Sequence, residues 1–198
     1  MAKDAIPSRL DSVVRGARGF GAVSLVAYGV WAFGGRRLGS QLGEGGFYAV
    51  MAAVFLGLTG LTLHPLVGGP RSFLRFTKVF VPAFLAYAAV WCAFWFKLKF
   101  GLGEWLGSLG GCLAFAAVAG LMLGGLRALP LAALVLFVGH SAGYFLGAPI
   151  CYAQKKHHPE LGMLAWGLLY GLGFGAGIGF AFHAFRKARR SVDSDPRL

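Results

Sequence analysis

The chain has 198 residues, of which 57% are hydrophobic and 13% charged, and its mean hydropathy is +0.67. A soluble domain carries about 25% charged residues, so this composition excludes an ordinary water-soluble protein and predicts a membrane protein. The net charge of +12 is expected to reflect contact with anionic lipid headgroups, and nucleic acid is not expected as a partner.

Six apolar stretches are long enough to cross the ~30 Å hydrocarbon core of a bilayer as helices. They cover residues 19–35, 46–67, 78–97, 105–125, 129–151 and 161–184, and the first is the shortest. The connections between them are too short to hold a further domain. The sequence therefore predicts an all-α integral membrane protein, a compact bundle of six transmembrane helices over residues 19–184.

Residues 1–18 are basic and precede the first span. Ser8 suits a helix N-cap, and Leu10 and Val14 share a face, which predicts a short amphipathic helix on the inner membrane surface. A frayed tail is the alternative. The first span also resembles a signal peptide, but Arg36 directly after the possible cleavage site disfavours cleavage.

Lysine and arginine are unevenly divided between the two sides of the predicted bundle. Thirteen lie on the side of the two termini and six on the other. Both termini, including the basic tail 185–198, are therefore expected in the cytoplasm, in a bacterial-type cytoplasmic (inner) membrane. Arg71, Arg75 and Lys78 on that side are expected to contact lipid headgroups, either as a general anchor or as a specific lipid site.

Glycines recur every four residues in the last two predicted spans. In lipid such spacing lets helices approach until their backbones touch. The fifth and sixth spans are therefore expected to pack as an antiparallel glycine-zipper hairpin at the core of the bundle, although either set could instead contact a second copy. Gly173 and Gly177 form a second face of the sixth span. The glycines with four-residue spacing are Gly139, Gly143 and Gly147, and Gly167, Gly171, Gly175 and Gly179.

The run from Gly171 to Gly179 resembles the glycine-repeat helix of rotary ATP synthase c subunits. The resemblance covers only these nine residues, and the chain lacks the ion-binding acid of that family. It therefore implies shared packing and no shared function.

Acidic residues are absent from the predicted spans. All seven lie in expected loops or tails, namely Asp4, Asp11, Glu44, Glu104, Glu160, Asp193 and Asp195. Proton relays and cation-coupled carriers generally use carboxylates within the membrane, so ion-coupled transport is not expected. Passive or solute-specific permeation remains compatible with the sequence.

Polar residues inside the spans are the candidates for function. His140, Ser141 and Tyr144 in the fifth span, with Thr59 in the second, could line a path for a solute. This group favours a small transporter-like or channel-like protein. The segment Gly139–Gly143 also matches the serine-hydrolase pattern G-x-S-x-G, and a serine with a histidine on the last of six spans resembles rhomboid proteases.

Catalysis at Ser141 is nevertheless not expected. It lies inside an apolar helix, and its depth differs from that of His183 by roughly 15 Å at ~1.5 Å per residue. That separation excludes a hydrogen-bonded pair. The chain is therefore not expected to be an enzyme.

Histidine supports a second hypothesis, a non-transporting subunit that scaffolds partners or binds a cofactor. His64 and His183 are expected at similar depth near the cytoplasmic boundary, where they could share a haem or a quinone headgroup. Ordinary structural histidines are the alternative. His157 and His158 in an outer loop provide only two ligands, so no metal site is predicted.

A faint repeat is a further alternative. Gly-Gly-Arg-Arg at residues 34–37 and Gly-Gly-Leu-Arg at 124–127 end the first and fourth spans. A three-helix repeat would invert its topology in the second copy, as in many secondary transporters.

Overall fold

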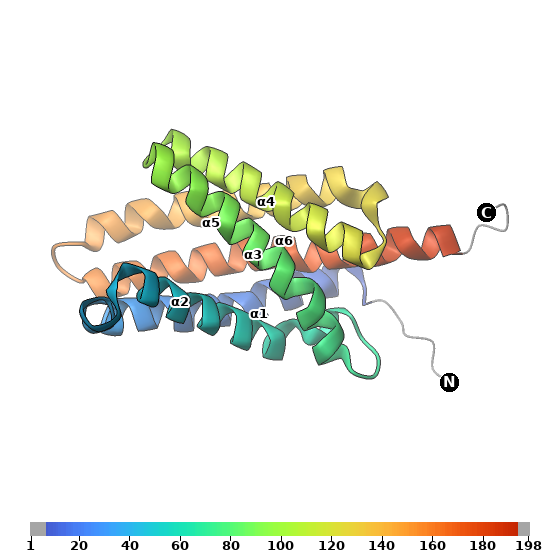
Figure 1. The fold of residues 1–198 in the computed structure, drawn as a ribbon, viewed down its shortest axis with the longest axis horizontal. Helices are drawn as coiled ribbons and strands as arrows, with labels where there is room; N and C mark the ends of the chain where they lie inside the picture. Colours follow the sequence, from blue (N-terminus) through green and yellow to red (C-terminus); the bar gives the residue numbers. More distant parts are fainter. Residues whose placement is uncertain (1–6, 194–198) are drawn as a thin grey trace.

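The computed structural model describes residues 7–193, which fold into helices without any strand. This confirms the all-helical expectation. The six long helices of the described residues run alternately in opposite directions, as the ribbon in Figure 1 shows. They are α1 (Arg9–Gly29), α2 (Gly35–Leu63), α3 (Ser72–Leu98), α4 (Leu102–Leu123), α5 (Leu129–Gln154) and α6 (Pro159–Asp193). Three short elements connect them: the π-helix η1 (Val30–Gly34) and the 3₁₀ turns η2 (His64–Leu66) and η3 (Leu126–Ala128).

Helix α1 is longer than the first predicted span. It begins after Ser8, whose hydroxyl accepts a hydrogen bond from the Asp11 backbone N–H at 3.0 Å. The basic segment and the first span thus form one helix. Ser12 and Gly16 are buried, whereas Leu10 is 71% exposed, so the first turns pack through their small residues rather than through the predicted apolar face.

Helix α2 follows α1 almost without a loop, because η1 continues the helical path. The residues between the first two predicted spans are therefore helical. The helical geometry is interrupted at Gly43, where φ is +68°, a conformation that glycine adopts without strain. The apolar part of α2 begins just beyond this point.

Five helical segments within the described chain are long and apolar enough to cross a membrane. They are Gly45–Leu66, Ser72–Leu98, Leu102–Leu123, Leu126–Gln154 and Pro159–Val192, which match the last five predicted spans. Helix α1 does not meet the same requirement. Its first ten residues include three arginines and Asp11, which lower its mean hydropathy.

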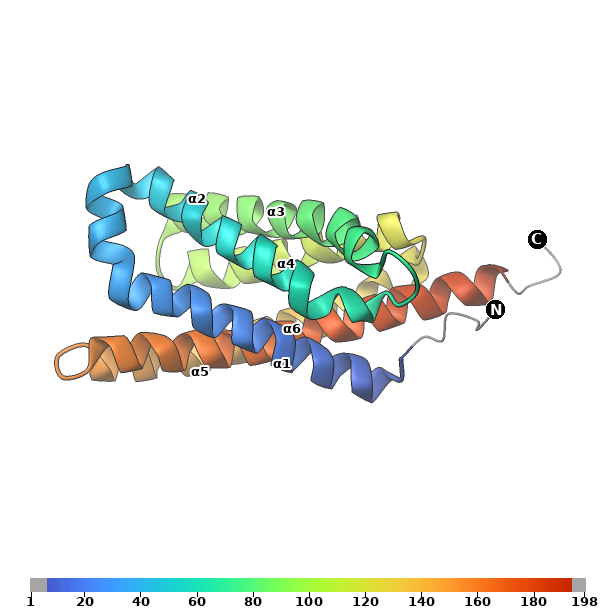
Figure 2. The same cartoon turned by 90° about the horizontal axis from the view of Figure 1, so that it is seen from below.

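Helix α6 occupies the centre of the bundle and lies between α1 and α5 (Figures 1 and 2). Helices α3 and α4 pack against each other, and α2 packs mainly on α1. The part of the predicted tail up to Asp193 continues α6, and residues 194–198 lie outside the described residues. Helix α2 contacts α3 far less than α5 contacts α6, so the two halves of the predicted repeat differ in packing.

Helix α6 approaches α1 at the four glycines spaced by four residues. A Cβ atom on Gly175 would lie 2.7 Å from Phe20 Cβ, and one on Gly171 would lie 2.9 Å from the Cα of Gly21. Gly179 and Gly167 similarly face Ser12 and Tyr28. At Gly171, Gly175 and Gly179 no side chain fits without moving backbone atoms of α1, and at Gly167 the Tyr28 side chain would have to move.

Helix α5 contacts the other glycine face of α6. A Cβ atom on Gly173 would overlap the carbonyl of Gly139, and one on Gly143 would lie 2.8 Å from the Cα of Tyr170. Further along, a Cβ atom on Gly147 would lie 2.9 Å from the Cα of Trp166. These short separations fix the register of α5 against α6.

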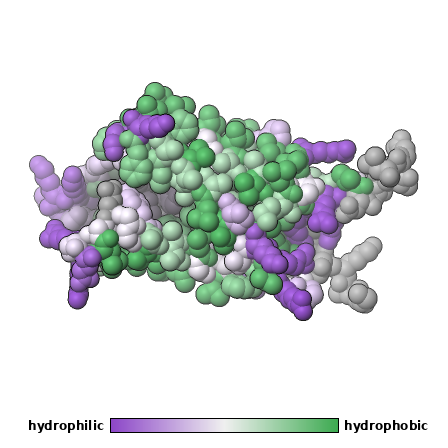
Figure 3. All heavy atoms as spheres, in the orientation of Figure 1, coloured by the Kyte–Doolittle hydropathy of each residue, from purple (hydrophilic) through white to green (hydrophobic). Residues whose placement is uncertain are grey.

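Phenylalanine fills the space between the helices. Phe20, Phe80, Phe115 and Phe174 are fully buried, and their rings contact one another or shared neighbours. The surface is apolar as well. Figure 3 shows hydrophilic side chains gathered at the two ends of the molecule, with a mainly hydrophobic band between them. Such a band is typical of a lipid-facing surface.

Candidate functional site

A hydrogen-bonded group of three side chains lies at the centre of the bundle. His140 on α5 is fully buried, and its Nε2 atom lies 2.7 Å from the hydroxyl oxygen of Tyr87 on α3. That hydroxyl oxygen lies 3.2 Å from the hydroxyl oxygen of Tyr170 on α6. Three helices therefore contribute one polar group each, and we call His140, Tyr87 and Tyr170 the central triad.

Close helix packing positions the triad. Gly139 and Gly143 on either side of His140 bring α5 against α6, so the imidazole is carried toward the centre of the bundle. Helix α3 closes the third side, where Tyr87 is 6% exposed. The glycine contacts thus determine where the polar groups meet.

Aromatic rings enclose the imidazole of His140. The ring of Phe174 lies edge-on with centroids 5.2 Å apart, and the ring of Tyr144 lies nearly parallel at 5.9 Å and 9°. This enclosure separates the imidazole from solvent. Hydrogen bonds in such a setting are strong, and an unsatisfied polar group there is costly.

Tyr144 links the triad to one end of the bundle. Its hydroxyl donates a hydrogen bond of 3.0 Å to Glu104 Oε1, in the first turn of α4. The other carboxylate oxygen accepts the backbone N–H of Gly101 at 3.0 Å, which caps α4. Glu104 was predicted to lie in a loop. Because α4 begins at Leu102, its carboxylate instead contacts a buried side chain.

Several buried polar atoms near the middle of the bundle have no hydrogen-bond partner among the described residues. They include His140 Nδ1, Ser141 Oγ, Ser108 Oγ and Thr59 Oγ1. Most buried polar atoms in proteins are satisfied, and exceptions often mark sites for ordered water or a small ligand. His140 Nδ1 and Ser141 Oγ come from adjacent residues on α5.

Three other predicted site residues lie apart from the triad. Thr59 is buried in α2, and its hydroxyl has no hydrogen-bond partner among the described residues. His64 Nδ1 lies 2.8 Å from Ser72 Oγ, and His183 Nδ1 lies 3.0 Å from the Pro7 carbonyl oxygen. The imidazoles of His64 and His183 thus have separate partners, and neither is hydrogen-bonded to Ser141 Oγ.

The predicted headgroup residues lie at the opposite end of the bundle from Glu104. Arg75 and Lys78 line a hollow that also includes arginines of α6. Arg71 precedes α3 with φ of +59° and does not belong to the lining. Arg75 and Lys78 therefore lie beside arginines of α6, and the sequence did not predict this proximity.

Within residues 7–193 no three His, Cys, Asp or Glu side chains gather in a way that could hold a metal ion. Cys92, Cys112 and Cys151 are free thiols. The arrangement offers hydrogen-bonding groups in an apolar surrounding.

Comparisons of the chain with protein-family models, with curated proteins and with solved structures found no match.

Sequence reasoning missed three members of the site. Tyr87 stands in an aromatic-rich span, Tyr170 in a glycine-rich span, and Glu104 just outside a predicted span. A tyrosine in mid-span was the available signal, because its hydroxyl needs a hydrogen-bond partner when buried.

Proposed function

We propose that this chain is a multi-pass protein of the cytoplasmic membrane that works as a small transporter or channel. In this proposal α1–α6 all span the membrane, the α5–α6 glycine zipper forms the rigid core, and both termini face the cytoplasm. The central triad, with Ser141 and Tyr144, is the polar site that a solute contacts on its way through.

The observation that carries the proposal is the buried polar pair on α5. His140 is 0% exposed and bonds Tyr87 through Nε2, while its Nδ1 and the adjacent Ser141 Oγ are without partners among the described residues. Polar groups are costly in a membrane interior, and those that occur there generally serve a pathway or a ligand. A bound polar solute would supply the missing hydrogen bonds.

The chemistry of the site favours an uncharged polar solute. Imidazole, serine and tyrosine groups donate and accept hydrogen bonds, and the triad contains no carboxylate, lysine or arginine. A bare ion would meet no opposite charge there and would be expensive to desolvate. The proposal therefore names small neutral hydrogen-bonding molecules as the substrate class.

The shape of the surface agrees with an entrance. In Figure 3 the surface is hollowed in the left half of the molecule. Helix α6 supplies Tyr170, which retains 7% exposure. Helix α2 contacts α3 much less than α3 contacts α4, so α2 and α3 would separate more readily than α3 and α4.

The test is solute flux in proteoliposomes of purified protein, with urea and glycerol as probes and stopped-flow light scattering as the readout. Tyr87→Phe removes one hydroxyl of the site, and Tyr28→Phe is the matched control, a buried tyrosine whose ring centroid lies 6.2 Å from that of Tyr170. Loss of a hydrogen bond worth about 1 kcal/mol should alter flux about fivefold. Flux equal to that of protein-free liposomes for both probes would refute the proposal.

Cofactor binding is the second candidate function. Its supporting observation is the bond between His183 Nδ1 and the Pro7 carbonyl, because ligating histidines commonly hold their second nitrogen in this way. The residues of this chain that would take part are His183 and His64. An absorbance spectrum of the purified protein tests it: a haem or quinone signal lost in His183→Ala would support it, and a spectrum with neither a haem nor a quinone band would exclude it.

A further inference from the structure

Two buried serines lie on neighbouring helices, Ser108 on α4 and Ser141 on α5. Neither hydroxyl has a hydrogen-bond partner among the described residues. A serine inside a helix can donate to a carbonyl one turn earlier, and most buried polar atoms in proteins are satisfied. Two unpaired hydroxyls on adjacent helices therefore require an explanation. We call Ser108 and Ser141 the serine pair.

The register of α4 against α5 places the two serines at the same level of the bundle. The Tyr144 hydroxyl donates a hydrogen bond of 3.0 Å to Glu104 Oε1 and ties the two helices together. Because α4 and α5 run in opposite directions, residue numbers rise along α4 as they fall along α5. Ser108 lies four residues beyond Glu104, and Ser141 lies three residues before Tyr144. Both steps are about one helical turn in the same direction.

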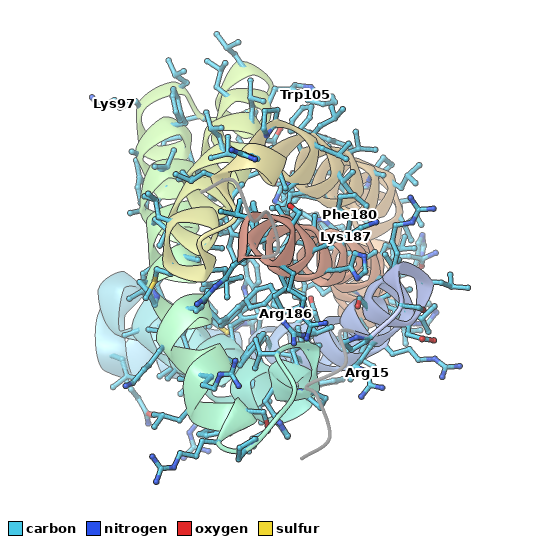
Figure 4. All side chains as sticks on the ribbon, turned by 90° about the vertical axis from the view of Figure 1, so that its right-hand side faces the viewer. Arg15, Lys97, Trp105, Phe180, Arg186 and Lys187 are labelled. Atoms are coloured by element: carbon cyan, nitrogen blue, oxygen red, sulfur yellow. The ribbon has the colours of Figure 1, made fainter. Side chains whose placement is uncertain are left out.

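The contacts of Trp105 show which faces of α4 and α5 meet. Its ring stacks on that of Phe145 with centroids 4.0 Å apart, and its centroid lies 6.2 Å from that of Phe137. These two phenylalanines are four residues on either side of Ser141, so Ser141 shares their face of α5. Ser108 is three residues after Trp105 and is therefore its neighbour on α4. Figure 4 shows Trp105 between the ribbons of α4 and α5.

A third unpaired polar atom comes from α3. Trp91 Nε1 is buried and has no hydrogen-bond partner within the described chain. The ring of Trp91 lies 6.1 Å from that of Tyr144. A Cβ atom on Gly107, the residue before Ser108, would lie 3.2 Å from Trp91 Cδ1, the carbon bonded to Nε1. Unpaired polar atoms from α3, α4 and α5 thus occur at one level of the bundle.

The chemistry of these groups favours a neutral ligand. The indole N–H can only donate a hydrogen bond, whereas each serine hydroxyl can donate and accept. Water, or a hydroxyl group of a larger molecule, offers an acceptor to the indole and either role to the serines. Buried water typically makes about three hydrogen bonds to groups that would otherwise be unsatisfied. The Glu104 carboxylate one turn away disfavours an anion.

We infer that the serine pair binds one small neutral molecule, either water or a hydroxyl group of a solute, with Trp91 Nε1 as a further donor. The inference adds Ser108 and Trp91 to the polar site described above. Binding at the serine pair does not require transport. Only the assignment of the bound molecule as a transported solute rests on the proposed function.

A double-mutant cycle on the full-length protein tests the inference. Ser108→Ala, Ser141→Ala and the double variant are unfolded in mixed detergent micelles. If both hydroxyls hold one molecule, either replacement alone already weakens its binding. The unfolding equilibrium constant of the double variant should then be at least about threefold smaller than the product of the two single changes predicts. The higher helix propensity of alanine enters the single and double variants alike and cancels.

Ser24→Ala combined with Ser108→Ala is the control cycle. The Ser24 hydroxyl, on α1, donates to the Gly167 carbonyl at 2.7 Å, so it has its own partner. The two changes of the control cycle should multiply within about twofold. If the changes of the serine pair also multiply, each hydroxyl acts alone and the inference is overturned.

Glycerol distinguishes the two sources of the bound molecule. If a solute hydroxyl occupies the site, glycerol should stabilise the wild-type protein more than the double variant, because a ligand of the folded state shifts the unfolding equilibrium. Equal stabilisation of both proteins would identify water. A coupled cycle together with flux equal to that of protein-free liposomes would refute transport and still support binding. A cycle without coupling would overturn the binding site, whatever the flux.

Discussion

The hydroxyl oxygen of Tyr87 lies 2.7 Å from Nε2 of His140, and this contact joins α3 to α5 at the centre of the bundle. The two residues are 53 positions apart in the chain, so the contact depends on the tertiary fold. It is also the innermost hydrogen bond between side chains that the described chain contains along α5. Removing this hydrogen bond should change both the stability of the protein and the function proposed for it.

Tyr87→Phe should destabilise the protein by about 1 kcal/mol, because it leaves the buried imidazole without its hydroxyl partner. Unfolding in mixed detergent micelles measures this free energy. Tyr28→Phe serves as the control and should change it by less than half as much. Equal destabilisation by both variants would show that the Tyr87–His140 contact adds nothing specific.

Gly175→Ala should destabilise the protein by about 1–3 kcal/mol, because the new methyl group would press on Phe20 and on the backbone of α1. Gly57→Ala is the matched control, since nothing lies within 4 Å of a Cβ atom at that position of α2. There the better helix propensity of alanine should stabilise by up to ~1 kcal/mol. Thermal unfolding of both variants in one detergent provides the measurement, and a stable Gly175→Ala protein would contradict the close α1–α6 contact.

Glu104→Ala should lower stability by about 1–2 kcal/mol, because the carboxylate both caps α4 and accepts the Tyr144 hydroxyl. Glu104→Gln keeps an acceptor oxygen and should lose less than half as much. Hydrogen exchange at the first turn of α4 reports the capping part separately. If the two variants unfold alike, the Tyr144 contact has no energetic role.

The proposed topology predicts opposite accessibility for the two ends of the bundle. In a background with the three native cysteines replaced by alanine, His157→Cys should react with a membrane-impermeant maleimide added to intact spheroplasts. Lys187→Cys should react only in inverted vesicles, because positive-rich ends remain in the cytoplasm. Reaction of both positions from the same side would rule out the six-span arrangement.

The spacing of glycines predicted two faces on the last helix but could not name the partner of each. Gly167, Gly171, Gly175 and Gly179 contact α1, while Gly173 and Gly177 contact α5. Spacing determines which residues share a face, whereas the choice of neighbour depends on how all six helices fit together. The same limit explains why Glu104 could not be linked to Tyr144.

The polar site was predictable in part. His140, Ser141 and Tyr144 are close in sequence and stood out as polar residues in an apolar helix. Tyr87 lies 53 positions before His140 and 83 positions before Tyr170, and a single sequence does not show which distant residues meet in the fold. Thr59 shared the chemistry of the site, but the fold leaves it on a helix that packs mainly against α1.

The contact between Gly16 and Gly175 has a consequence for how the protein is made. The two residues are 159 positions apart, so α1 emerges from the ribosome long before α6 exists. At ~5–20 residues per second the delay is on the order of ten seconds. During that interval the glycine face of α1 has no native partner, and α6 then has to enter between α1 and α5. Assembly of these six helices therefore cannot be completed until α6 has been synthesised.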